Sequence, residues 1–141
     1  MAADKNNVYC STKILQGLDP KSTHLLGNGY LTDGKTSYFC SPKGEKQPGF
    51  NEFIAVMKSI ANIFIKRYEG SSYFYKNVRI DSVNLEPIFD MGFARDGSTL
   101  YYMGEKLDAD PRGLKFIKTL NGQKSDYFTD GRSVFLDGVK L

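Results

Sequence analysis

Asp130-Gly131-Arg132-Ser133-Val134-Phe135 is one copy of a phrase that organises the whole chain. An acidic residue, usually followed by Gly, precedes two spacer residues and then apolar or aromatic residues. Further copies begin at Asp4, Asp33, Glu69 and Asp96, so a unit of roughly 30 residues is repeated. Asp-Gly tolerates positive φ, and β-forming residues on both sides make the phrase a hairpin signal. The sequence therefore predicts a single domain, residues 1–141, of about five divergent hairpin units that start near residues 4, 33, 69, 96 and 130.

The segments between these phrases supply further strands. Val8-Tyr9-Cys10 and Ile14-Leu15 have the composition of strands, and Asp137-Gly138 marks the tightest hairpin in the chain. We expect a mainly β fold (α+β with minor helix) in which irregular antiparallel hairpins form one twisted sheet. The repeats diverge too much to predict a regular solenoid.

An insertion at residues 40–68 lengthens the second unit. Asn51 is a good N-cap and the apolar residues after it have helical spacing, which predicts one short helix over about 51–61. The segment Ile63-Phe64-Ile65 occupies the position that a strand takes before the turn in the other units. We therefore expect the helix to end near Ala61 and a strand to follow it.

The composition is that of a folded protein in water. Of the 141 residues, 40% are hydrophobic and 25% are charged, and the net charge is +3. No apolar run is long enough to span a membrane. Residues 1–7 lack the charged and apolar regions of a signal peptide. We expect a cytoplasmic protein, or an exported one if an export signal has been removed.

The two cysteines do not form a disulfide framework. Cys10 lies six residues after Asp4, and Cys40 lies seven residues after Asp33. An offset of one residue places the two side chains on opposite faces of equivalent strands. We therefore expect two free, half-buried thiols.

Residues suited to catalysis or metal binding are sparse. The single histidine, His24, would have to serve as the base for Cys10 or Cys40, and neither cysteine lies in a nucleophile motif. Two Cys and one His do not make a zinc site, and Asp108-Ala109-Asp110 lacks the Gly and the distal Glu of a calcium loop. We expect no enzyme, no metal ion and no cofactor.

A mixed basic and aromatic cluster is the best candidate for nucleic-acid binding. Its members are Lys66, Arg67, Tyr68, Tyr73, Tyr75, Lys76 and Arg79. Such a mixture could stack single-stranded bases. Alternating Tyr and Lys is also ordinary for an exposed antiparallel strand, and the net charge is small for nucleic-acid binding. We expect no nucleic-acid partner.

Charge is unevenly distributed along the chain. Residues 35–79 hold eight basic and three acidic side chains, whereas residues 81–110 hold two basic and seven acidic ones. This asymmetry fits either two solvated faces or the electrostatic steering of a partner.

The repeated phrase resembles that of the bacterial DKNNYE repeat family. The resemblance rests on Asp4-Lys5-Asn6-Asn7-Val8-Tyr9, on the later Asp-Gly copies, and on the Asp-Pro segments at Asp19-Pro20 and Asp110-Pro111. It covers residues 4–39 and 93–141 most clearly, and the insertion departs from it. The resemblance implies a bacterial protein without known enzymatic activity. Members of that family often look like exported or surface proteins, and some lie beside toxins, where an immunity role is inferred.

Two hypotheses from different classes follow. The first is an immunity protein that neutralises a cognate protein toxin through a protein–protein interface. The alternative is a structural or adhesive repeat domain of a surface or periplasmic protein. A toxin would present Lys or Arg to an acidic surface, for which we predict Asp81, Glu86, Asp90, Glu105, Asp108 and Asp110. The runner-up surface is the insertion, with Lys46, Phe50 and Phe53.

Overall fold

The structure, a computed structural model, describes residues 1–41, 45–46, 73–74, 76–89 and 92–141. In this part of the chain the regular structure consists of strands, without a helix. The strands are β1 (Ala2–Ala3), β2 (Val8–Cys10), β3 (Lys13–Ile14), β4 (His24–Gly27), β5 (Tyr30–Thr32), β6 (Ser37–Cys40), β7 (Glu45–Lys46), β8 (Tyr73–Phe74), β9 (Asn77–Ile80), β10 (Glu86–Pro87), β11 (Phe93–Asp96), β12 (Thr99–Tyr102), β13 (Glu105–Leu107), β14 (Lys115–Lys118), β15 (Lys124–Thr129), β16 (Val134–Leu136) and β17 (Val139–Lys140).

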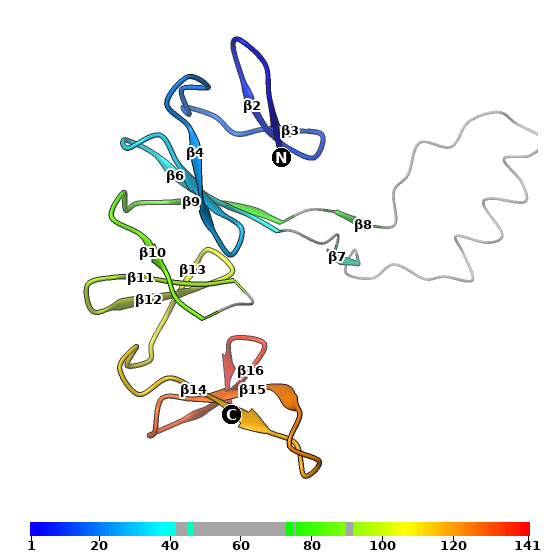
Figure 1. Ribbon diagram of the computed structural model, residues 1–141, viewed down its shortest axis with the longest axis vertical. Helices are drawn as coiled ribbons and strands as arrows, with labels where there is room; N and C mark the ends of the chain where they lie inside the picture. The colour runs from blue at the N-terminus through cyan, green and yellow to red at the C-terminus, as the bar shows by residue number, and fades with distance from the viewer. Residues whose placement is uncertain (42–44, 47–72, 75, 90–91) are drawn as a thin grey trace, which may run out of the picture.

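These strands form separate antiparallel sheets that stack along the long axis of the molecule (Figure 1). The first sheet has the order β1-β2-β3, the second β4-β5-β6-β9, the third β10-β11-β12-β13 and the fourth β14-β15-β16-β17. A two-stranded ribbon, β7-β8, lies to one side of the stack. The predicted β class is confirmed, but the expected single twisted sheet is wrong: the repeats form a stack of small sheets. The predicted helix over 51–61 and the strand at 63–65 lie outside the described residues.

The repeated acidic residue fixes the register of each sheet. In the second, third and fourth sheets, the residue three positions before the Asp pairs with the residue six positions after it. These pairs are Tyr30 with Phe39, Phe93 with Tyr102, and Tyr127 with Leu136. The residues two before and five after the Asp also pair, namely Leu31 with Tyr38, Ala94 with Tyr101, Phe128 with Phe135 and, in the first sheet, Ala2 with Tyr9. The predicted hairpins at Asp4, Asp33, Asp96 and Asp130 are therefore present in one common register, whereas Glu69 lies outside the described residues.

Each inner sheet buries both of its faces, one against the sheet before it and the other against the sheet after it. Because successive side chains in a strand alternate, the two sets of pairs point in opposite directions. Leu31 and Tyr38 pack toward the first sheet, in a cluster with Val8 and Cys10. Tyr30 and Phe39 pack toward the third sheet, in a second cluster that includes Ala94 and Tyr101. A third cluster joins the third and fourth sheets through Phe93, Leu100, Leu114, Phe128 and Phe135. Inner sheets thus have two apolar faces.

A glycine in the second turn of the unit lets successive sheets approach closely. Met103 and Gly104 form a two-residue turn with φ values of 48° and 85°, and Asp137 and Gly138 form another with 50° and 81°. A Cβ atom on Gly104 would lie 2.7 Å from the Cβ of Phe39 in the second sheet. The predicted tight turn at Asp137-Gly138 is confirmed.

Polar contacts also cross the boundary between the second and third sheets. The hydroxyl of Tyr30 donates a hydrogen bond to the carbonyl of Gly92 at 2.7 Å and accepts one from the amide of Gly104 at 3.1 Å. The side-chain amide of Asn28 donates to the carbonyls of Ile88 and Phe93. Burial raises the pKa of Tyr30, so its hydroxyl stays protonated and able to donate.

The insertion occupies the position of the second turn in the second sheet. Cys40 at the end of β6 pairs with Asn77 at the start of β9, so the segment between them replaces a two-residue turn. The ribbon β7-β8 belongs to this segment. A long insertion is tolerated there because the strands on both sides of it keep their pairing.

The expectation of two free thiols is wrong, because Cys10 and Cys40 form a disulfide. The two Cα atoms lie 5.8 Å apart, and both side chains are buried rather than half-buried. The one-residue offset does place the cysteines on opposite faces of equivalent strands. Since the first sheet precedes the second in the stack (Figure 1), Cys10 faces the following sheet and Cys40 faces the preceding one. Opposite faces of adjacent sheets meet, so the offset brings the sulfur atoms together.

Candidate partner-binding surface

The carboxylates of the repeated turns are occupied by the backbone. The Oδ1 atom of Asp33 accepts the amides of Lys35 and Thr36 at 2.8 and 2.7 Å, and its Oδ2 accepts the amide of Asp19 at 2.9 Å. Burial opposes ionisation of Asp33, but the three amides outweigh it and lower the pKa. This carboxylate shapes the turn and ties it to the preceding Asp-Pro segment.

Asp130 repeats this arrangement in the fourth sheet. Its Oδ1 accepts the amides of Arg132 and Ser133 at 2.9 and 2.8 Å, and its Oδ2 accepts the amide of Asp110 at 3.3 Å. The amides of Ser133 and Arg132 lower the pKa of this carboxyl group. The turn carboxylates are therefore structural, and a partner would have to use other groups.

Three of the six acidic residues predicted to face a partner are engaged in ion pairs. Glu86 contacts Nη2 of Arg95 at 2.7 Å, across the β10–β11 pair. Glu105 on β13 contacts Nζ of Lys76, next to β9, at 2.8 Å. Asp110 forms a two-pronged pair with Arg112, through Nε at 3.0 Å and Nη2 at 2.9 Å.

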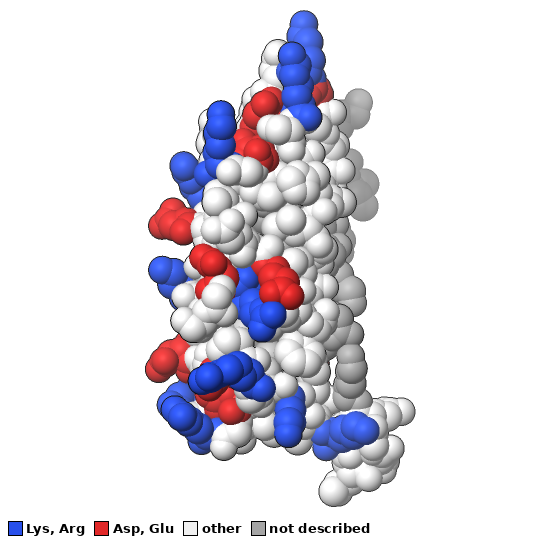
Figure 2. Space-filling model, turned by 60° about the vertical axis from the view of Figure 1, so that its left-hand side comes forward, with Lys and Arg blue, Asp and Glu red and all other residues white. Residues whose placement is uncertain are grey.

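The acidic segment of the sequence is therefore not an acidic patch in space. Two of the three pairing cations, Lys76 and Arg112, lie outside the acidic segment of residues 81–110. Asp81 and Asp108 are exposed and make no ion pair within the described part of the chain. Asp90 lies outside the described residues. Figure 2 shows acidic and basic side chains intermingled along one long edge of the stack.

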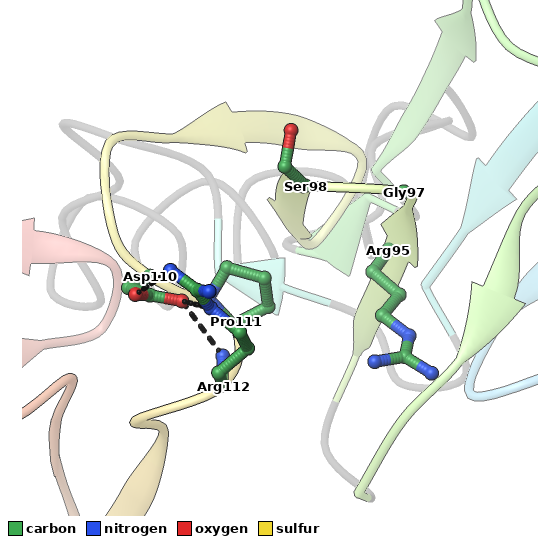
Figure 3. A pocket seen from close by; sticks show the side chains of 6 residues that line it. All are labelled: Arg95, Gly97, Ser98, Asp110, Pro111 and Arg112. Atoms are coloured by element: carbon green, nitrogen blue, oxygen red, sulfur yellow. Dashed lines mark hydrogen bonds and ion pairs between the residues drawn. The ribbon is translucent and has the colours of Figure 1, made fainter.

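An open cleft lies beside one of these ion pairs. It has a volume of about 430 Å³ and is lined by Arg95, Gly97, Ser98, Asp110, Pro111 and Arg112. Figure 3 shows Arg95 across the cleft from Asp110 and Arg112. The Arg112 guanidinium lowers the pKa of Asp110 to about 2, so the pair stays charged at neutral pH. Each arginine already binds a carboxylate of this chain, and an anionic ligand would have to compete with it.

The remaining candidates from the sequence are dispersed. His24 is exposed at the start of β4, with Nδ1 3.1 Å from the carbonyl oxygen of Ser22. Lys46 lies in β7, but Phe50 and Phe53 lie outside the described residues. No group of three His, Cys, Asp or Glu side chains able to hold a metal ion occurs in the described ranges.

The structure describes only part of the basic and aromatic cluster predicted from the sequence. Lys76 pairs with Glu105, and Arg79 is exposed on β9. Tyr73 lies in β8, while Lys66, Arg67, Tyr68 and Tyr75 lie outside the described residues. The prediction that nucleic acid is not a partner stays a prediction.

Sequence reasoning missed the disulfide and the two-faced packing of the sheets. A signal for the two-faced packing was present, because the positions three before and six after each Asp are as apolar as those two before and five after. A strand that buries both faces has apolar residues at both sets of positions.

No helix within the described ranges has the length and apolar character needed to cross a lipid bilayer. A family model described as the DKNYY family matches residues 1–138. The match agrees in kind with the repeat-family resemblance of the sequence, under the description DKNYY rather than DKNNYE. Neither a curated protein nor a solved structure matches the chain significantly.

Proposed function

The chain belongs to the DKNYY family, and from this premise we propose that it is a non-catalytic bacterial protein that binds another protein outside the cytoplasm. The observation that carries the compartment is the Cys10–Cys40 disulfide. Disulfides form and persist in the periplasm and at the cell surface, and are rare in the reducing cytoplasm. This part of the proposal replaces the cytoplasmic location expected from the sequence.

A binding function is favoured over catalysis by the state of the polar groups. The turn carboxylates of Asp33 and Asp130 hold backbone amides, and the acidic groups of Glu86, Glu105 and Asp110 hold cations. Catalysis needs a positioned acid, base or nucleophile in a site that excludes water. The groups beside the cleft are instead satisfied by their neighbours and open to solvent.

The specific role we propose is neutralisation of a cognate protein toxin that reaches the same compartment. Asp81 and Asp108 are the acidic residues best able to attract a basic partner, since no cation of the described chain pairs with them. Charges of this kind mainly accelerate association. The alternative, a structural or adhesive repeat of a surface protein, is favoured by the same disulfide and by the elongated stack.

The test is to express the candidate toxin encoded beside this gene together with the protein directed either to the periplasm or to the cytoplasm. We expect the periplasmic form alone to restore growth and the purified proteins to bind. Equal protection by the cytoplasmic form would overturn the proposed compartment. Failure of every neighbouring toxin candidate to bind would remove the neutralising role and favour the surface-repeat alternative.

A matched pair of double variants tests the acidic residues. Asp81→Asn with Asp108→Asn removes two carboxylates that pair with no cation in the described part of the chain. Glu86→Gln with Glu105→Gln removes two that do form ion pairs there. Both variants change the net charge by the same amount. We expect the first to slow association with the toxin several-fold at low salt and the second to have a smaller effect. Equal effects would mean that only the overall charge matters.

A further inference from the structure

The fourth sheet displays a row of side chains that the inner sheets bury. In the second sheet the residues three before and six after the turn Asp are Tyr30 and Phe39, both 0% exposed. In the fourth sheet the same positions hold Tyr127, which is 41% exposed, and Leu136, which is half-buried. The turns that set this register have the same hydrogen bonds in both sheets.

The correspondence extends to the last strand of each sheet. Phe39 pairs with Val78, which packs in the cluster between the second and third sheets. Leu136 pairs with Val139, which is 65% exposed. The face of the fourth sheet at positions −3 and +6, here called the C-terminal end face, includes Tyr127, Val134, Leu136, Val139 and Leu141.

The first sheet supplies a matching face at the other end of the stack. Ala2 and Tyr9 lie two before and five after Asp4, the positions through which every later sheet packs on the sheet before it. Tyr9 also pairs with Ile14, which is 44% exposed. Ala2, Tyr9 and Ile14 form the N-terminal end face, and its positions have no preceding sheet in the structure.

We propose that the C-terminal end face of one molecule binds the N-terminal end face of a second copy. Every internal boundary joins the face at positions −3 and +6 of one sheet to the face at positions −2 and +5 of the next. A second copy placed head to tail continues this packing with the same residue positions in contact. A contact between two different faces is heterologous, so it generates open rows or closed rings rather than two-fold symmetric dimers.

The association is weak and depends on concentration, because only a few exposed apolar side chains meet at each end. It does not depend on the proposed binding function, since the partner is the chain itself. The contact requires no residue of the insertion and none of the acidic residues near the cleft.

The experiment measures the weight-average mass of the protein over a wide range of concentrations by sedimentation. The variant Val139→Lys blocks the C-terminal end face, and Ile14→Lys blocks the N-terminal end face. Leu25→Lys is the matched control, because Leu25 is also 65% exposed but lies on the edge strand β4, away from both end faces. Thermal melting checks that each variant is folded.

We expect the mass of the wild type and of Leu25→Lys to rise with concentration, and each end-face variant alone to stay monomeric. A mixture of Val139→Lys and Ile14→Lys should form dimers and nothing larger, since each retains the face that the other lacks. A wild type that is monomeric throughout overturns the proposal and leaves the face to a different partner. An Ile14→Lys variant that dimerises alone overturns the head-to-tail arrangement.

Discussion

Removing the Cys10–Cys40 disulfide should strongly destabilise the stack. The bond closes a loop with a sequence separation of 30 residues and joins β2 of the first sheet to β6 of the second. Chain-entropy reasoning for a loop of this length gives about 3.6 kcal/mol of stabilisation through the unfolded state. Each buried sulfur contributes about 1 kcal/mol of packing in addition.

These two terms make the variants strongly non-additive. Cys10→Ala and Cys40→Ala each remove the same bond, so each should cost about 4–5 kcal/mol of unfolding free energy. The double variant removes no second bond, and should cost only about 1 kcal/mol more than either single one. In thermal melting a loss of this size corresponds to a decrease of about 15 °C for a domain of this length.

The assay is denaturant unfolding of the wild type, both single variants and the double variant, with and without a reductant. Reductant should lower the unfolding free energy of the wild type by about 3.6 kcal/mol, which leaves it about 2 kcal/mol above the double variant because both sulfur atoms stay packed. The double variant should be unchanged by reductant. Amide exchange should locate the first loss of protection in residues 1–15, which the bond ties to the second sheet. Single variants that each cost about 1 kcal/mol and simply add would refute the disulfide.

Three further predictions follow from the turns and the core. Gly131→Val should cost about 1–3 kcal/mol because φ is 87°, and Gly138→Val should cost more because its Cβ would lie 2.5 Å from Cδ1 of Tyr102; equal denaturation midpoints would contradict this packing. Tyr30→Phe should cost about 1–3 kcal/mol by leaving buried backbone groups without partners, and an unchanged midpoint would contradict those hydrogen bonds. The pKa of Asp33 is lowered in the folded state, so its carboxylate stabilises the fold above about pH 4, and this contribution is lost as the pH falls through the pKa of the folded state. The melting temperatures of the wild type and of Asp33→Asn should therefore converge in that acidic range. A difference that stays constant with pH would argue against a role for the charge.

Much of the local structure could be predicted from the sequence. The Asp-Gly phrase carries its own turn chemistry, since a carboxylate two or three residues ahead of an amide can bond to it directly. Asp4, Asp33 and Asp130 all do so. Such contacts depend only on residues that are close in sequence, so they can be predicted without knowledge of the fold.

The stacking of the sheets was harder to predict because it depends on which faces meet. By itself, the one-residue offset between Cys10 and Cys40 predicts that the two thiols lie too far apart to bond, since side chains on opposite faces of one sheet do not meet. In a stack, opposite faces of adjacent sheets are the ones in contact. The same alternation of side chains therefore brings the two sulfur atoms together in a stack, whereas it would keep them apart within one sheet. Only the arrangement of the sheets decides which of these outcomes occurs.

The charge pattern failed as a guide to the surface for a similar reason. Counting acids over residues 81–110 ignores cations that arrive from elsewhere in the chain. Lys76 reaches Glu105 from the neighbouring sheet, and Arg112 folds back onto Asp110 within a turn. At Asp81 and Asp108, both exposed, no cation of the described chain offsets the negative charge that the sequence predicts.

The most direct test of a protein that works outside the cytoplasm is to trap its thiols in the bacterium that makes it. Cells are treated with an alkylating reagent before lysis, fractionated, and analysed by mass spectrometry without reduction. We expect an unmodified disulfide-linked peptide pair containing Cys10 and Cys40, recovered with the periplasmic or surface fraction. Recovery of both cysteines as alkylated thiols in the cytoplasmic fraction would contradict the proposed compartment.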